Sequence, residues 1–206
     1  MKLKSLALIS LFAASLMGCK HTLTPQQLNT LEGREIYFAK VGSPVDHDPN
    51  QTNFGLDGVS TATRNKIANG LSEAFNMKST SEIFYLSEDD FNMWDGFDQS
   101  YLKIIEENPQ KVLTGILIQT GYLGYNITDF GGWVFDKQKI VELQLPVHIV
   151  DMQEKKRIGY SICKRTYVVY IDELDQKEKH LPVYNQFSKD CSTEILSFIF
   201  GLNFTT

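Results

Sequence analysis

This 206-residue sequence lacks several features that would assign it directly to a known class. After its amino-terminal end it has no apolar stretch approaching 18 residues, so no membrane-spanning helix is expected there. It has no G-x-S-x-G motif, no H-E-x-x-H motif and no glycine loop of the kind that cradles phosphate. No internal repeat of about 20 to 50 residues is visible, which argues against solenoids and propellers. We therefore expect no enzyme, although an active site assembled from distant residues stays open.

Clusters of basic residues are missing as well. The 20 lysines and arginines are scattered along the chain and are outnumbered by 25 acidic residues, which gives a formal net charge of −5. This balance offers no electrostatic footprint for nucleic acid or for an anionic bilayer surface, so we expect no nucleic-acid partner. Charge alone therefore gives the chain no means of attachment to a membrane surface.

The amino terminus has the features of a lipoprotein precursor. Lys2 and Lys4 form a short basic start, and an apolar run of about a dozen residues follows, which is typical of a signal peptide and too short to span a bilayer. The run ends in Leu16-Met17-Gly18-Cys19, which resembles the lipobox of bacterial lipoproteins. The resemblance implies removal of residues 1–18, a diacylglyceryl thioether on Cys19 and a further acyl chain, such as palmitate, on the new amino group.

The residue after the lipobox bears on location. Lys20 stands where, in enteric-type bacteria, an aspartate would tend to retain the protein in the inner membrane. We therefore expect an outer-membrane lipoprotein whose domain faces the periplasm, with surface exposure left open. Residues 19–33 are polar and predict a lipidated tether that reaches at most about 50 Å. Residues 34–206 are expected to form one domain, because 42% apolar residues suit a single well-buried core.

Only three cysteines are present, and none forms a C-x-x-C redox motif. With Cys19 lipidated, Cys163 and Cys191 remain in a compartment outside the cytoplasm, where thiols tend to oxidise. We expect a disulfide between them, which would close a loop of about 28 residues and contribute on the order of 3 kcal/mol.

Hydrophobic periodicity predicts the fold. Two-residue alternation predicts strands at 34–41, 82–86, 111–125, 140–151 and 156–171. Helical spacing predicts helices at about 61–76, 88–107 and 183–202. The predicted order is β-α-β-α-β-β-β-α, an α/β (α+β) domain with a single mixed sheet of about five strands and helices packed on it.

The lipobox, this element order and the strand motif Val112-Leu113-Thr114-Gly115 together look like the periplasmic domain of the curli-secretion channel lipoprotein. The amino-terminal domain of the Tol-system propeller protein and the outer-membrane activators of penicillin-binding proteins are similar. The resemblance implies envelope proteins as partners and, in the channel family, a homo-oligomeric ring. Our leading hypothesis is a scaffold or assembly component of an envelope machine. The alternatives are a subunit of an oligomeric secretion channel and an activator of a cell-wall synthase.

The most unusual stretch runs from Gly121 to Phe135 and combines glycines with aromatic residues in what should be a hairpin tip. Its aromatics either fold back onto the core or form an anchor patch for a partner or the lipid interface, which tyrosine and tryptophan suit. The patch would comprise Tyr122, Tyr125, Phe130, Trp133 and Phe135. The loop at 42–58 is long enough to be a second contact surface.

No metal and no cofactor is predicted apart from the covalent lipid on Cys19. Asp46-His47-Asp48 offers ligands in the long loop, but a metal site needs three or four converging ligands, so a solvated loop is favoured. His148 falls on the strand face opposite the apolar one, and we expect it at the surface or at an interface. Neighbouring acids such as Glu106-Glu107 diverge by about 100° on a helix, so they are not expected to form a catalytic dyad.

Overall fold

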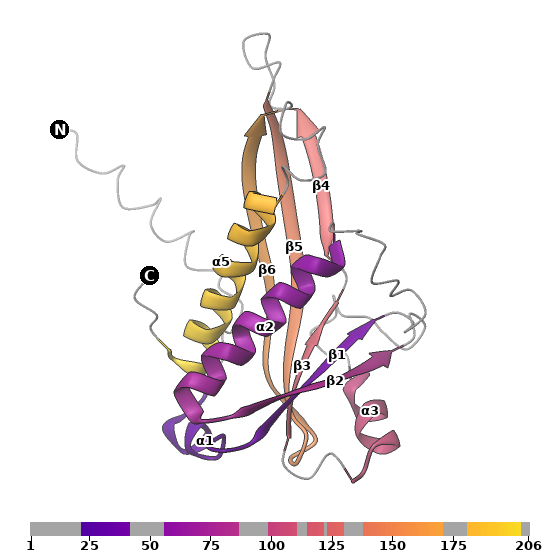
Figure 1. The fold of residues 1–206 in the computed structure, drawn as a ribbon, viewed down its shortest axis with the longest axis vertical. Helices are drawn as coiled ribbons and strands as arrows, with labels where there is room; N and C mark the ends of the chain where they lie inside the picture. The colour runs from indigo at the N-terminus through magenta and orange to yellow at the C-terminus, as the bar shows by residue number, and fades with distance from the viewer. Residues whose placement is uncertain are drawn as a thin grey trace, which may run out of the picture.

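The computed structural model describes residues 22–41, 56–86, 99–110, 115–121, 123–129, 138–170 and 181–202. In chain order these contain α1 (Pro25–Asn29), β1 (Glu35–Val41), α2 (Leu56–Phe75), β2 (Lys78–Leu86), α3 (Tyr101–Glu107), β3 (Gly115–Thr120), β4 (Gly124–Asp129), β5 (Gln138–Asp151), β6 (Lys156–Tyr170) and α5 (Leu181–Phe200). Figure 1 shows one sheet with helices packed on it. None of the helices in these stretches is long and apolar enough to cross a membrane.

The strands form one mixed sheet, so the predicted fold class is confirmed. β1 lies between β2 and β3 and is parallel to both, while β5 is antiparallel to β3, β4 and β6. β6 pairs with one edge of β5 along its whole length. The opposite edge of β5 is shared by two strands: β3 pairs with residues 147–151, and β4 pairs with residues 139–144. The strand predicted at 111–125 is therefore divided into two, which gives six strands in place of about five.

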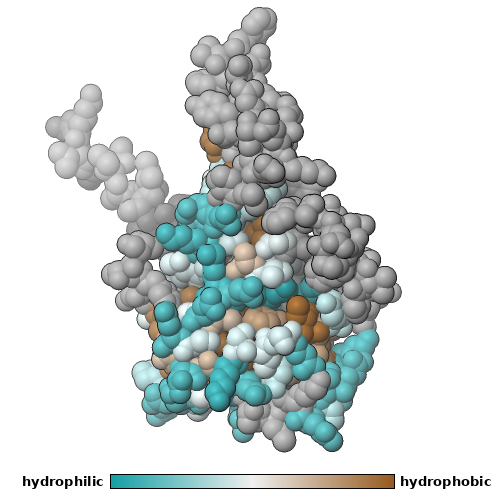
Figure 2. Space-filling view, viewed as in Figure 1, coloured by the Kyte–Doolittle hydropathy of each residue, from teal (hydrophilic) through white to brown (hydrophobic). Residues whose placement is uncertain are grey.

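α2 and α5 lie side by side over one face of the sheet and bury the main hydrophobic core (Figure 1). Alternate residues of β5 from Val141 to Ile149 point into this core, as the two-residue alternation predicted. α2 contributes Ile67 and Leu71, which are four residues apart and so share one helical face. α5 contributes a stripe at the same spacing: Phe187, Cys191, Ile195 and Ile199. Hydrophilic side chains dominate the outer surface of this layer, as Figure 2 shows.

α3 covers part of the opposite face, over a second and smaller core. Tyr101, Ile104 and Ile105 are buried there with side chains of β1 and β3. Gly115 opens β3 beneath them, and a Cβ atom at that position would lie 2.6 Å from the ring of Tyr37, so only glycine allows this close approach. Residues 88–98 of the helix predicted at 88–107 lie outside the described residues, and Tyr101–Glu107 is helical.

The amino-terminal segment packs onto the domain, which differs from the tether predicted over residues 19–33. Leu23 and Leu31 are 4% and 1% exposed and belong to the main core. Between them lies α1, which begins with a capping box. The backbone N–H of Leu23 donates to the carbonyl oxygen of Ile199 at 2.9 Å. Residues 22–33 are therefore part of the domain, and a linker to the predicted lipid can include only residues 19–21.

Candidate functional site

The aromatic patch predicted as a partner anchor falls largely outside the described residues. This holds for Tyr122, Phe130, Trp133 and Phe135, for the predicted lipid-bearing Cys19 and for Asp46-His47-Asp48. Tyr125 lies within β4, where its backbone pairs with Leu143 of β5. Residues 124–129 of the predicted hairpin tip are strand, because β4 pairs with β5 as far as Asp129, and residues 130–135 lie outside the described residues.

A disulfide bond joins Cys163 of β6 to Cys191 of α5, the pair expected from the sequence. Both residues are fully buried, and their Cα atoms are 5.6 Å apart, within the range that disulfides favour. The bond links α5 covalently to β6, a strand at the edge of the sheet. Its position in the core indicates a structural role.

Polar contacts also join the same helix and strand. Arg165 donates to Glu194 at 2.6 Å, and the hydroxyl of Tyr167 donates to Asp190 at 3.2 Å. Burial, together with the negative charge of Asp190, raises the pKa of Tyr167 well above its usual range. With Cys163, these contacts show that the odd-numbered side chains from 163 to 167 point toward α5. The even-numbered side chains from 162 to 168 therefore point to the opposite face.

A buried ion pair lies at the end of the sheet, near the turn between β5 and β6. Arg34 donates to both carboxylate oxygens of Asp151, at 2.7 and 2.8 Å, and to the carbonyl oxygen of Gly115 at 3.1 Å. Burial alone would raise the pKa of Asp151. The hydrogen bonds and positive charge of Arg34, together with hydrogen bonds from the backbone N–H groups of Glu154 and Gln153, outweigh burial and hold that pKa below its usual value. The pair joins the segment before β1 to the end of β5, which is again a structural role.

Three side chains lie in register across the sheet and form what we name the polar row: Gln119, His148 and Tyr160. Gln119 and His148 are fully buried, and the imidazole meets the Tyr160 ring edge-on at a centroid distance of 4.8 Å. The amide nitrogen of Gln119 donates to the hydroxyl of Ser100 at 3.0 Å. His148 was expected at the surface or at an interface, and the structure places it in the interior of the domain. In the part of the chain that the structure describes, no three metal-ligating side chains gather.

Two serines precede a lysine by three residues, a spacing found at the nucleophile of class A β-lactamases and penicillin-binding proteins. Ser161 and Lys164 lie on β6, where this spacing places them on opposite faces of the strand. Ser100 precedes Lys103 at the start of α3, and its hydroxyl accepts the hydrogen bond from Gln119. Ser161 and Lys164 therefore cannot act together. Ser100 and Lys103 have the spacing of the motif, but the spacing alone does not indicate that Ser100 is a nucleophile.

The face of the sheet that points away from α5 carries exposed residues on its outer strands. On β6, Ile162 and Val168 are 37% and 52% exposed. We name this surface the open face and define it by Asn126, Thr128, Ile140, Glu142, Gln144, Ile162, Lys164, Thr166 and Val168. Among the described residues, the outer edge of β6 pairs with no strand. The sequence could have indicated this face, because Ile162 and Val168 stand at even-numbered positions of a strand whose odd-numbered side chains contact α5.

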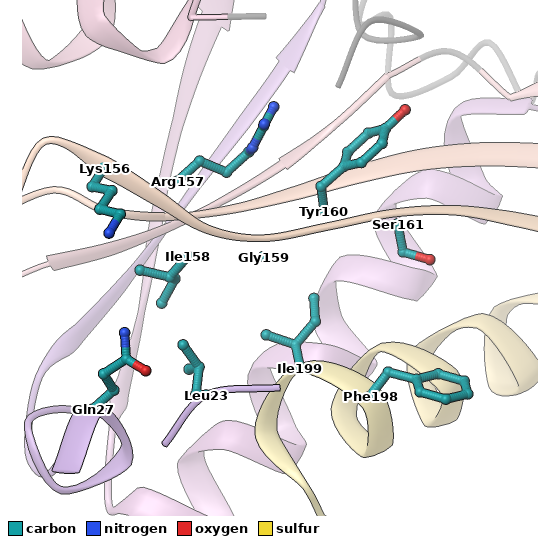
Figure 3. A pocket seen from close by; sticks show the side chains of 10 residues that line it. All are labelled: Leu23, Gln27, Lys156, Arg157, Ile158, Gly159, Tyr160, Ser161, Phe198 and Ile199. Carbon is teal, nitrogen blue, oxygen red and sulfur yellow. The ribbon is translucent and has the colours of Figure 1, made fainter. Parts of the chain in front are cut away.

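At the other end of β6, two adjoining hollows of about 300 Å³ and about 290 Å³ lie between the strand, α1 and α5. Leu23, Gln27, Lys156 and Ile158 line both hollows, and Phe198, which is 42% exposed, lines the larger one. Figure 3 shows Gln27 and Leu23 pointing toward Lys156 and Ile158. We name this region the α1 end of the domain: α1, the turn at residues 152–155 and the last turn of α5.

Comparisons with known proteins give weak likenesses. No protein-family model matches the chain, and no curated protein matches it. A minor lipoprotein from Acinetobacter baumannii is 8% identical, with 80% of this chain and 92% of that chain covered and a TM-score of 0.41. A hypothetical protein from Chlamydia trachomatis is 7% identical, with 83% and 99% covered and a TM-score of 0.42. A lipoprotein from Neisseria meningitidis is 12% identical, with 76% and 99% covered and a TM-score of 0.35. Likenesses this weak assign neither family nor function, so the resemblance to the curli-channel, Tol and activator families stays a prediction.

Proposed function

We propose that the chain is a lipid-anchored lipoprotein of the bacterial envelope, held at the outer membrane, that binds other envelope proteins and catalyses no reaction. The lipobox-like Leu16-Met17-Gly18-Cys19 supports the anchor. The function is then that of a scaffold or assembly component of an envelope machine.

The open face is the observation that carries this proposal. It presents two exposed branched aliphatic side chains, Ile162 and Val168, on a strand whose outer edge is unpaired in the described part of the domain. Natural proteins generally protect such edges. Exposed aliphatic side chains on an edge strand, which here alternate with Lys164 and Thr166, therefore favour a surface that a partner covers. Strand addition along β6 would supply affinity through backbone hydrogen bonds, and the side chains of the open face would supply specificity.

Two ion pairs support the non-catalytic part of the proposal. Arg34 and Asp151 are engaged with each other, and Arg165 and Glu194 connect β6 to α5. Each of these contacts joins elements that are distant in the sequence, so their charges stabilise the fold. Their partners are already supplied by the chain itself.

The length of the linker bears on the synthase-activator alternative. Such an activator must reach from its membrane across the periplasm. Since Leu23 is already buried in the main core, the segment from Cys19 to Thr22 spans at most about 11 Å when extended. The domain itself would have to span the rest of the periplasm. The short linker therefore favours a partner near the membrane that holds the lipid anchor. The secretion-channel alternative shares the anchor and stays a prediction.

Photo-crosslinking in intact cells tests the proposed function. A photo-crosslinking residue would replace Val168 or Ile162 on the open face and, as a matched control, Lys189, which is exposed on α5. We expect specific heavier bands from the two open-face positions that contain an envelope protein or a second copy of the chain. The control position should give none of these bands. Absence of bands from both open-face variants at normal protein levels would refute the proposal.

A further inference from the structure

We infer that the α1 end of the domain faces the membrane and contacts phospholipid headgroups, and that the open face is presented away from the bilayer. The inference rests on the proposed lipid anchor at Cys19 and adds an orientation to it. Its basis is the place at which the folded chain begins.

The amino-terminal linker is too short to let the domain turn freely. With residues 19–21 fully extended, the Cα atoms of Cys19 and Thr22 can be at most about 11 Å apart. The next residue, Leu23, is buried in the main core and is held to Ile199 by a backbone hydrogen bond. The acyl chains must therefore enter the bilayer close to the α1 end. An end held this close to the bilayer surface lies within the headgroup region.

The side chains at the α1 end suit that region. Phe198 is exposed in the last turn of α5, and aromatic rings are enriched where membranes meet water. Lys155 and Lys156 are exposed at the turn between β5 and β6, and long basic side chains can place their charges among lipid phosphates. Glu154 is the exposed acid of the same turn, and Asp151 is engaged by Arg34. The turn and the first residue of β6 thus carry two lysines beside one exposed acid, and Glu32 is a second exposed acid just after α1.

The open face lies toward the far end of the same strand. Val168 is twelve residues beyond Lys156 on β6, which corresponds to about 40 Å of extended strand. Figure 1 shows the turn between β5 and β6 and the far ends of these strands at opposite ends of the long axis of the molecule. A domain seated on its α1 end would therefore hold the open face clear of the lipid, where a protein partner can approach it.

Fluorescence quenching by headgroup-labelled lipid tests this orientation. The full-length chain would be produced in a lipoprotein-processing host and reconstituted in phosphatidylethanolamine and phosphatidylglycerol vesicles that contain a nitroxide-headgroup lipid. A fluorophore would be attached at Phe198→Cys or, because that change touches the edge of the core, at Gln26→Cys on the exposed side of α1. Val168→Cys provides the matched control. The native Cys163 and Cys191 are joined and buried, so they should not react with the label.

The expected result is quenching at positions 198 and 26 that exceeds quenching at position 168 by at least about threefold. Phe198 lies beside residues 159–161 of β6, and position 168 is at least seven residues, or about 23 Å of extended strand, farther from the α1 end. Equal quenching at all three positions, in protein that floats with the vesicles, would overturn the orientation while leaving the lipid anchor intact. Protein that does not float with the vesicles would overturn the anchor and, with it, the orientation.

Discussion

Removing the disulfide by the double substitution Cys163→Ala and Cys191→Ala should lower the free energy of unfolding by about 3.5 kcal/mol at 25 °C. The magnitude follows from the separation of 28 residues between the two cysteines, because the crosslink restricts the unfolded chain more strongly than the folded one. Both side chains are fully buried, so the truncated alanines also lose packing in the main core. The loss should therefore be no smaller than the chain-entropy value.

Urea unfolding of residues 19–206 measures this loss, with Cys19→Ser as the common background so that no lipid or free thiol interferes. The background protein should unfold at a markedly lower urea concentration when a reductant is present during unfolding. The double variant should be insensitive to the reductant, which is the internal control. A difference below about 1 kcal/mol between the oxidised background protein and the double variant would refute the reasoning, since the entropy of loop closure alone exceeds that value.

Two further substitutions test the packing and the buried ion pair. Gly159→Ala should cost about 1 to 3 kcal/mol, because its Cβ atom would lie 2.5 Å from Cδ1 of Ile199. Gly58→Ala, with no atom within 4 Å of its Cβ, should not destabilise the fold in the same urea assay. Asp151→Asn should cost about 3 to 5 kcal/mol near neutral pH, because it leaves the Arg34 guanidinium buried without its counter-charge. Since the folded-state pKa of Asp151 is lowered, its contribution is present above the unfolded pKa and is lost as pH falls through the folded pKa, so the two proteins should converge in stability in acid. A difference that stays constant down to strongly acidic pH would contradict this linkage.

The sequence predicted the elements whose burial follows a simple period. In β5, residues from Val141 to Ile149 alternate between the core and the opposite face, and the strand was found where this pattern placed it. The stripe from Phe187 to Ile199 likewise identified the buried side of α5. The cysteine pairing could be anticipated because the lipobox accounts for Cys19 and leaves two partners.

The sequence could not predict features that depend on contacts between distant segments. Leu23 and Leu31 stand among polar residues, so their burial becomes visible only when α5 and the sheet are in place. Residues 111–125 have the pattern of one strand, and the division after Thr120 depends on how β3 and β4 share an edge of β5. His148 alternates with the core residues of β5, and nothing in that alternation indicates that the second face is also buried there.

Mass spectrometry of the chain purified from bacterial membranes tests the central claim most directly. We predict that the mature protein begins at Cys19 and carries the mass of a diacylglyceryl group plus an amide-linked acyl chain. The Cys19→Ser variant should keep residues 1–18 and lack the lipid mass. An unmodified Cys19, or a mature chain that begins at another residue, would contradict the account of this protein as a lipid-anchored envelope lipoprotein.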